Sequence, residues 1–181
     1  CPECGKDHVL FMGCGTQKAE DDIASMFPDL RILRMDYDTT QAKFSHEEIL
    51  DKFRRGQADV LLGTQMVTKG HDFPRVATVG VLSADNSLAL DDYRAGERTF
   101  AMLTQVIGRA GRGNVPGKAI IQTYNPESDV ILRAASQDYK SFYKSEIRLR
   151  KALCFPPFCD IAVITLSSAD EGYLGMMTNL M

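Results

Sequence analysis

The sequence predicts an α/β protein built around a doubly wound, mainly parallel β-sheet that is flanked by helices. Short apolar runs alternate with segments whose apolar residues recur at helical spacing, a pattern typical of βαβ units. The 181 residues, 44% hydrophobic and 25% charged, suffice for one well-buried domain and part of a second. No segment approaches the roughly 20 consecutive apolar residues that cross a bilayer, so no membrane partner is expected.

The first strand and helix are predicted near the start of the chain. Residues 8–13 form an apolar run typical of a buried strand. Thr16 can cap the helix that follows, because a threonine side chain can accept hydrogen bonds from free amides at a helix start. Ala19, Ile23 and Phe27 then recur at helical spacing and give this helix one apolar face.

The next unit is predicted from a second strand at residues 31–35 and a third at residues 59–64. Between them, Ser45 and Glu48 have the spacing of a capping box, which marks a helix start. Gly56 is expected to end that helix, because glycine readily adopts the left-handed conformation found after helix ends.

The alternation continues with strands predicted at residues 76–82 and 119–123 and one long helix over residues 91–109 between them. Strands joined in this way by helices run parallel, so a single sheet accounts for the chain up to residue 123.

A basic helical segment follows the last strand. Its apolar stripe consists of Tyr139, Phe142, Tyr143 and Ile147. Basic residues dominate the remaining positions, namely Lys140, Lys144, Arg148, Arg150 and Lys151. A solvated basic face and a DNA-facing strip both explain these charges. Because the net charge of the chain is −3, contact with nucleic acid has to come from local basic strips.

A domain boundary is expected near residue 155. Pro156 and Pro157 stop the preceding helix, because proline lacks an amide donor and restricts the residue before it. Residues 160–167 then predict the first strand of a further domain.

Of the five cysteines, Cys1 and Cys4 form a C-x-x-C-G knuckle, in which a turn aims two thiolates at one metal ion. A structural zinc site needs four ligands, so this pair is expected to supply half of a Zn²⁺ site at most. Cys14, Cys154 and Cys159 lie among apolar residues, where small buried thiols are usual.

The run from Gln105 to Gly113 is the most informative part of the sequence. It places Arg109 and Arg112 three residues apart among glycines. Guanidinium groups stay charged and match phosphate oxygens with a rigid planar fork, while glycine lets the backbone approach a ligand. The pattern Q-x-x-G-R-x-G-R resembles the last motif of the superfamily-2 helicases and translocases.

A second polar run, from Gly63 to Pro74, directly follows the third predicted strand. Ligands of open α/β sheets gather at the carboxyl ends of strands, so Thr64 can hold a nucleic-acid phosphate there. Asp72 is placed to accept a hydrogen bond from a ribose hydroxyl. The pattern G-T-x-x-x-x-x-G-x-D matches the penultimate helicase motif.

The sequence contains neither a G-x-x-x-x-G-K-[ST] phosphate loop nor a D-E-x-H motif. The lysine and carboxylate that hold the phosphates and Mg²⁺ of ATP are therefore expected on another lobe, and this chain alone is expected not to hydrolyse ATP.

Across its whole length the chain resembles the primosomal replication-restart helicases of superfamily 2. The resemblance rests on C-P-E-C-G at residues 1–5, D-Y-D-T-T at 36–40, K-G-H-D-F-P at 69–74, D-Y-R-A-G-E-R at 92–98 and L-C-F-P-P-F at 153–158. It implies a fragment with the end of a zinc-binding insertion (residues 1–7), a second RecA-like lobe (8–127), a helical linker (128–154) and the truncated start of a C-terminal domain (155–181).

The resemblance implies an ATP-dependent 3′–5′ DNA helicase that acts at stalled forks and D-loops to restart replication. Implied partners are DNA, single-strand DNA-binding protein and primosome proteins, in the bacterial cytoplasm near the nucleoid. Implied cofactors are ATP with Mg²⁺, held mostly by the absent lobe, and Zn²⁺. The alternative is a non-enzymatic nucleic-acid or protein-interaction module with a zinc-knuckle edge.

The resemblance also implies roles for individual residues. Those expected at the γ-phosphate are Gln105, Arg109 and Arg112, with Arg112 favoured as the arginine finger. Those expected at the nucleotide are Gly70 and Asp72. Those expected at DNA are Thr16, Thr64 and Lys69. Those expected to brace loops as paired charges are Asp36, Asp38, Glu97 and Arg98.

Overall fold

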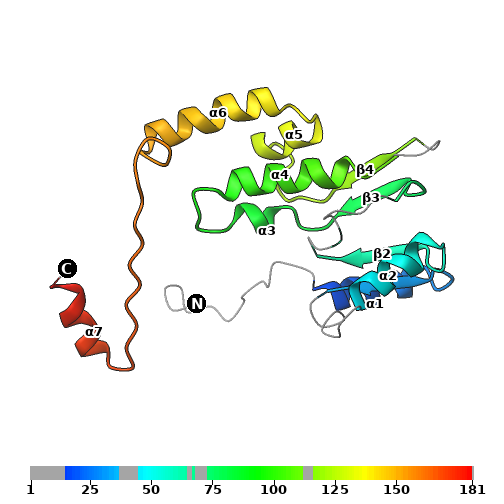
Figure 1. The fold of residues 1–181 in the computed structure, drawn as a ribbon, viewed down its shortest axis with the longest axis horizontal. Coiled ribbons are helices and arrows are strands. Elements are labelled where there is room, and N and C mark those ends of the chain that lie inside the picture. The colour runs from blue at the N-terminus through cyan, green and yellow to red at the C-terminus, as the bar shows by residue number, and fades with distance from the viewer. Residues whose placement is uncertain (1–14, 37–44, 65–66, 68–72, 112–115, 181) are drawn as a thin grey trace. The chain divides into compact units, whose positions relative to one another are not determined.

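The computed structural model describes residues 15–36, 45–64, 67, 73–111 and 116–180. Within these ranges, helices and short strands are interspersed up to residue 121, and only helices follow (Figure 1). The helices are α1 (Thr16–Met26), α2 (Ser45–Arg54), α3 (Asp85–Leu88), α4 (Ala95–Ile107), α5 (Asp129–Ala135), α6 (Tyr139–Ala152) and α7 (Glu171–Thr178). The strands are β1 (Ile32–Met35), β2 (Val60–Gly63), β3 (Thr78–Val81) and β4 (Lys118–Ile121).

The described strands form two parallel pairs. β1 pairs with β2, with Met35 opposite Gly63 at the carboxyl end, and β3 pairs with β4, with Val81 opposite Ile121. This arrangement confirms the α/β class and the four strands predicted between residues 31 and 123. Within the described residues, however, the strands form two separate two-stranded sheets and not the single sheet that the sequence predicts, because no backbone ladder joins one pair to the other. The strand predicted at residues 8–13 lies outside the described residues.

Helix α2 ends as the sequence predicts. Gly56 has a φ of +74°, its amide donates to the carbonyl of Phe53 (3.0 Å), and the amide of Gln57 donates to the carbonyl of Lys52 (3.0 Å). These two bonds form a Schellman motif, which satisfies carbonyls that the helix end would leave unpaired. Arg31 and Arg75 donate to the next carbonyls, at Gly56 (3.1 Å) and Arg54 (2.8 Å).

Helix α1 begins differently from the prediction. Its N-cap is Gly15, which has no side chain to bind the first amides, and Thr16 is the first helical residue. The Thr16 hydroxyl instead donates to Asp36 Oδ2 (2.6 Å), a residue twenty positions away in the sequence. The expectation that Thr16 caps the helix is therefore wrong, because a tertiary hydrogen bond holds its side chain.

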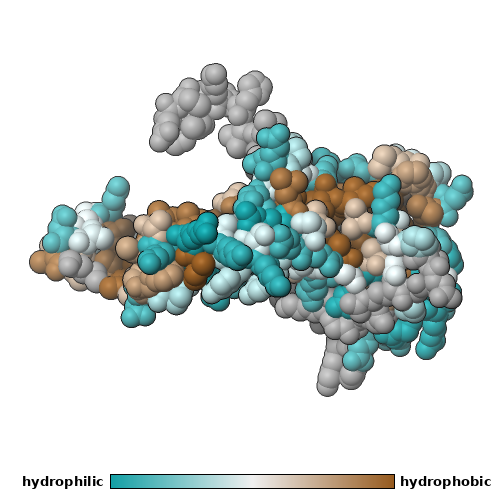
Figure 2. All heavy atoms as spheres, turned by 90° about the horizontal axis from the view of Figure 1, so that it is seen from above, coloured by the Kyte–Doolittle hydropathy of each residue, from teal (hydrophilic) through white to brown (hydrophobic). Residues whose placement is uncertain are grey.

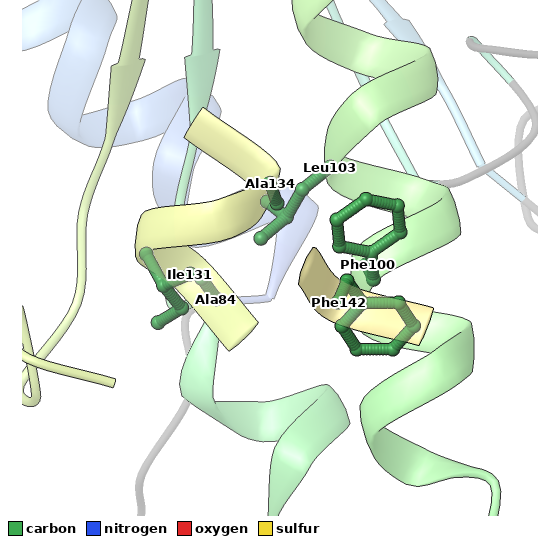
Figure 3. Packing of buried hydrophobic residues seen from close by; sticks show 6 residues of the cluster. All are labelled: Ala84, Phe100, Leu103, Ile131, Ala134 and Phe142. Carbon is green, nitrogen blue, oxygen red and sulfur yellow. The ribbon is translucent and has the colours of Figure 1, made fainter. Parts of the chain in front are cut away.

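The larger core lies between α4, α5 and the start of α6 (Figure 3). The rings of Phe100 and Phe142 stack with their centroids 4.1 Å apart and an interplanar angle of 9°. Leu103, Ile131 and Ala134 pack beside them and are buried. Of the apolar stripe predicted in this region, Phe142 is buried, whereas Tyr139 and Tyr143 are exposed.

A smaller core lies beside β1 and β2. Met35, Leu50 and Phe73 are its buried members, and Val76 is a half-buried residue that packs against them. Elsewhere, large apolar side chains such as Tyr124 and Leu132 stay exposed. Hydrophobic areas also interrupt the hydrophilic surface of the face seen in Figure 2. The two cores thus take up only part of the apolar side chains.

The chain divides into two compact units, Cys1–Phe142 and Tyr143–Met181. The first extends beyond residue 127, where the sequence places the start of a linker, because α5 and Phe142 contribute to the larger core. In the second unit, residues 160–167 form no strand. A strand requires a hydrogen-bonded neighbour, and the described residues provide none for this segment.

Each helix within the described ranges is too short or too polar to span a lipid bilayer.

Candidate nucleotide and nucleic-acid site

The C-terminal end of α4 carries the predicted arginine motif. Gly108 caps the helix, and its amide donates to the carbonyl of Thr104 (3.0 Å). The amides of Arg109 and Ala110 then donate to the carbonyls of Val106 (3.0 Å) and Ile107 (3.1 Å). We call residues 108–111 the arginine turn. These bonds fix the backbone that bears Arg109, whose side chain is half-buried.

Two contacts from distant parts of the chain hold the arginine turn in place. Gly111 has a φ of +70°, and its amide donates to the carbonyl of Val76 (3.0 Å), just before β3. Gly117, just before β4, packs directly on the turn, since a Cβ atom there would lie 2.4 Å from the carbonyl carbon of Ala110. The turn is therefore anchored at the amino ends of both strands of the β3–β4 pair.

Helix α4 orients the motif by burying one face. Thr99, Leu103 and Val106 are buried, whereas Gln105 is exposed on the side of the helix away from Leu103. Arg98 on this helix forms an ion pair with Asp92 (Nη1 to Oδ2, 2.6 Å), which confirms its predicted bracing role.

The carboxyl end of the β1–β2 pair gathers three polar residues. Thr64 follows Gly63 and is exposed, and Asp36 follows Met35, the residue opposite Gly63. Thr16, at the start of α1, reaches the same end through its hydrogen bond to Asp36. The structure thus brings Thr16 and Thr64, both predicted to contact DNA, to one end of the β1–β2 pair.

Asp36 is the organising residue of this end. It is 6% exposed, and its Oδ2 lies 3.4 Å from Arg34 Nε, which also lies 3.3 Å from Glu20 Oε2. The predicted role of Asp36 as a paired charge is confirmed. Because the Thr16 hydroxyl donates to Asp36, its proton is not available to a phosphate. The amides at the start of α1 are the donors that an anion would meet there.

A carboxylate outside the motifs organises the other end of the β3–β4 pair. Asp85, at the start of α3, accepts hydrogen bonds from the amide of Tyr124 (3.0 Å) and the hydroxyl of Thr123 (2.8 Å). These bonds, led by that of the Tyr124 amide, lower the pKa of Asp85 below its ordinary value. Sequence inspection did not single out Asp85 or Gly117, because their roles depend on contacts between distant segments.

Several predicted site residues lie outside the described residues, namely Cys1, Cys4, Asp38, Lys69, Gly70, Asp72 and Arg112. Among the residues that the structure does describe, no cluster of histidine, cysteine, aspartate or glutamate side chains could hold a metal ion. The described part of the predicted site therefore consists of Gln105 and Arg109 on the arginine turn and its helix, and of Thr16 and Thr64 at the β1–β2 end.

Comparison with known proteins adds independent information. Residues 6–114, more than half of the chain, match the family model described as the helicase conserved C-terminal domain. The chain is 48% identical to the replication restart protein PriA of Bacillus subtilis over 167 residues, and 46% identical to that of Synechocystis over 171 residues. These alignments cover 92% and 94% of this chain but only 21% of either relative.

Solved structures with a similar arrangement include the C-terminal domain of the DEAD-box protein Dbp5. That domain has a TM-score of 0.47 and 21% sequence identity, with 75% of this chain and 78% of that chain covered. The yeast DEAD-box splicing factor Prp28 has a TM-score of 0.45 and 16% identity, over 84% of this chain and 32% of that chain.

Proposed function

Because the chain belongs to the helicase conserved C-terminal domain family, we propose that it is the second lobe of an ATP-driven DNA motor that restarts replication. The similarity to PriA proteins over most of the chain supports this role. The chain spans about a fifth of the length of those relatives (21%). In this proposal the first lobe and the other domains of the motor would lie outside it.

The observation that carries the proposal is the anchored arginine turn. A guanidinium that binds a γ-phosphate has to be held in place before the nucleotide binds, because preorganised charge is what stabilises the transition state. Arg109 sits in a turn fixed by hydrogen bonds and by the packing of Gly117. In this proposal Arg109 and Arg112 bind the γ-phosphate of ATP–Mg²⁺ held by the first lobe, and Gln105, Gly70 and Asp72 complete the contacts.

The carboxyl end of the β1–β2 pair is the proposed DNA contact. Thr64 is exposed there, and the uncapped first turn of α1 offers backbone amides at Thr16. Such donors hold phosphates without reading base sequence, as a translocating motor requires. Lys69 would add a positive charge. The two lobes would close when ATP binds and open after hydrolysis, and this cycle would move the proposed DNA contact along the strand.

The same proposal includes the direction, the substrates and the partners of the motor. It would move 3′–5′ and act on stalled forks and D-loops with single-strand DNA-binding protein and primosome proteins, in the cytoplasm near the nucleoid. Cys1 and Cys4 would contribute two of the four thiolates of a zinc site. Since the catalytic lysine and carboxylate belong to the first lobe, this chain alone would not hydrolyse ATP.

The test compares two substitutions in the intact protein. Arg109→Ala should abolish DNA-stimulated ATP hydrolysis while leaving the affinity for forked DNA largely unchanged. Arg55→Ala, which removes an exposed arginine just after α2, is the matched control and should retain hydrolysis. Undiminished hydrolysis by the Arg109→Ala protein would refute the assigned role of the arginine turn.

A further inference from the structure

Helix α6 carries a row of basic side chains that the proposed motor function does not use. Lys140, Lys144, Arg148 and Lys151 are all exposed. At 3.6 residues per turn, their spacing places them within an arc of about 80° and along about 16 Å of the helix. We call these four residues the cationic stripe.

The stripe lies on the side of α6 away from its buried residue. Phe142, whose ring stacks on Phe100, projects nearly opposite to the centre of the stripe by helical geometry. The packing that anchors the start of α6 therefore does not require the lysines or Arg148. Their charges are available to an external partner.

The positive charge of α6 is not neutralised within the helix. The helix holds five basic side chains and one acidic side chain, Glu146. Glu146 pairs with Arg150, the one basic residue of α6 outside the stripe, since its Oε1 accepts a hydrogen bond from Arg150 Nε (2.8 Å). In the described part of the chain, the stripe residues take part in no ion pair. A local surplus of four positive charges thus stands in a chain whose net charge is −3.

We propose that the cationic stripe binds the phosphate backbone of duplex DNA, an inference that rests on the proposed DNA-motor function. Duplex DNA presents one negative charge per about 1.7 Å of its axis, so a straight row of four cations meets several phosphates at once. Flexible lysine side chains contact phosphates as point charges and read no base sequence. The stripe therefore adds affinity for the duplex without adding sequence preference.

The experiment measures the salt dependence of binding by the intact protein to forked duplex DNA. Lys144→Gln/Arg148→Gln removes two stripe charges. Lys52→Gln/Arg55→Gln removes two exposed charges at the end of α2, so its net charge equals that of the Lys144→Gln/Arg148→Gln variant. Lys144→Arg/Arg148→Lys keeps the stripe charged and tests whether the substituted helix still folds and binds.

Each phosphate contact contributes about 0.9 to the slope of log K against log salt concentration, so loss of two contacts should reduce the slope by about 1.8. The ratio of the DNA-binding constant of the parent protein to that of the Lys144→Gln/Arg148→Gln variant should accordingly fall about 12-fold between 50 and 200 mM salt. The other two variants should keep the parental slope, and all should hydrolyse ATP normally at saturating DNA.

Equal slopes for the two charge-removing variants would overturn the stripe as a DNA contact. That outcome leaves the motor function intact, because the Arg109→Ala measurement tests it separately. Conversely, normal hydrolysis by Arg109→Ala together with a reduced slope for the Lys144→Gln/Arg148→Gln variant would support the stripe as a DNA contact and refute the role of Arg109 at the γ-phosphate.

Discussion

Replacing Gly117 with alanine is expected to displace the arginine turn and thereby to lower ATP turnover by the intact protein. Gly117 has no special backbone conformation to lose, so the substitution acts through the added methyl group alone. That group would point into the backbone of Ala110 and Gly111, neither of which has a flexible side chain that could give way.

The size of the effect follows from the contact distances. The added Cβ atom would lie 2.4 Å from the carbonyl carbon of Ala110 and 2.5 Å from the amide nitrogen of Gly111, whereas ordinary contact begins at 3.4 Å. One of the two segments must therefore move by about 1 Å, and overpacking of this kind costs about 1–3 kcal/mol. A catalytic group misplaced by about 1 Å can lose about 100-fold in rate.

The assay is steady-state ATP hydrolysis at saturating DNA, with DNA affinity measured in parallel. Gly117→Ala should reduce turnover by about 100-fold and leave DNA affinity unchanged, because the proposed DNA contacts lie at the β1–β2 end. Gly80→Ala is the matched control, since a Cβ atom at Gly80 would meet no heavy atom of the described residues within 4 Å. Turnover by Gly117→Ala equal to that of the control would refute the claim that Gly117 positions Arg109.

Three further predictions concern the stability of the chain. Leu103 is fully buried, so Leu103→Ala should lower the free energy of unfolding in urea by about 3–5 kcal/mol, and a loss below 1 kcal/mol would contradict its core position. Thr99 is also fully buried, and its hydroxyl forms a hydrogen bond with none of the described residues. Thr99→Val should therefore raise the free energy of unfolding by about 1 kcal/mol, whereas a decrease would show that the hydroxyl has a hydrogen-bond partner. Hydrogen bonds from Arg31 lower the pKa of Asp59 from 3.8 to about 2, so the stabilisation by this pair should be complete above pH 3.8 and disappear as the pH falls toward 2. In the Arg31→Ala protein, the pKa of Asp59 measured by NMR titration should return toward 3.8. An unchanged pKa would contradict the claim that Arg31 lowers it.

The strands were predictable because their signal is local. Apolar runs at residues 31–35 and 59–64 correspond to β1 and β2, and those at 76–82 and 119–123 correspond to β3 and β4. The helix end at Gly56 was predictable for the same reason, since the Schellman motif requires only a residue that tolerates a positive φ.

The start of α4 was not predicted correctly. The helical pattern begins at residue 91, but the helix itself begins at Ala95. Asp92 explains the difference, because its Oδ1 accepts a hydrogen bond from the amide of Arg94 (2.9 Å) and its Oδ2 pairs with Arg98. A short polar side chain that binds nearby backbone amides competes with the helix and moves its start.

The motif residues of the candidate site could be proposed from the sequence, but the contacts that support them could not. Arg109 and Thr64 were found from spacing and from their position after a helix or strand. The hydrogen bond between Thr16 and Asp36 and the packing of Gly117 join segments that are distant in the sequence. Such contacts have no local signature, because the sequence around a glycine or a threonine does not indicate which distant segment it will contact.

Val76 links the two parts of the proposed site. Its side chain packs against the core of Met35, Leu50 and Phe73, beside β1 and β2. Its carbonyl accepts the amide of Gly111 in the arginine turn (3.0 Å). A rearrangement of the β1–β2 core that moved Val76 would therefore change the position of Arg109 through one hydrogen bond. Since packed cores change between discrete arrangements rather than deform smoothly, Val76 would give the proposed motor a physical route from the proposed DNA contact to the proposed phosphate contact.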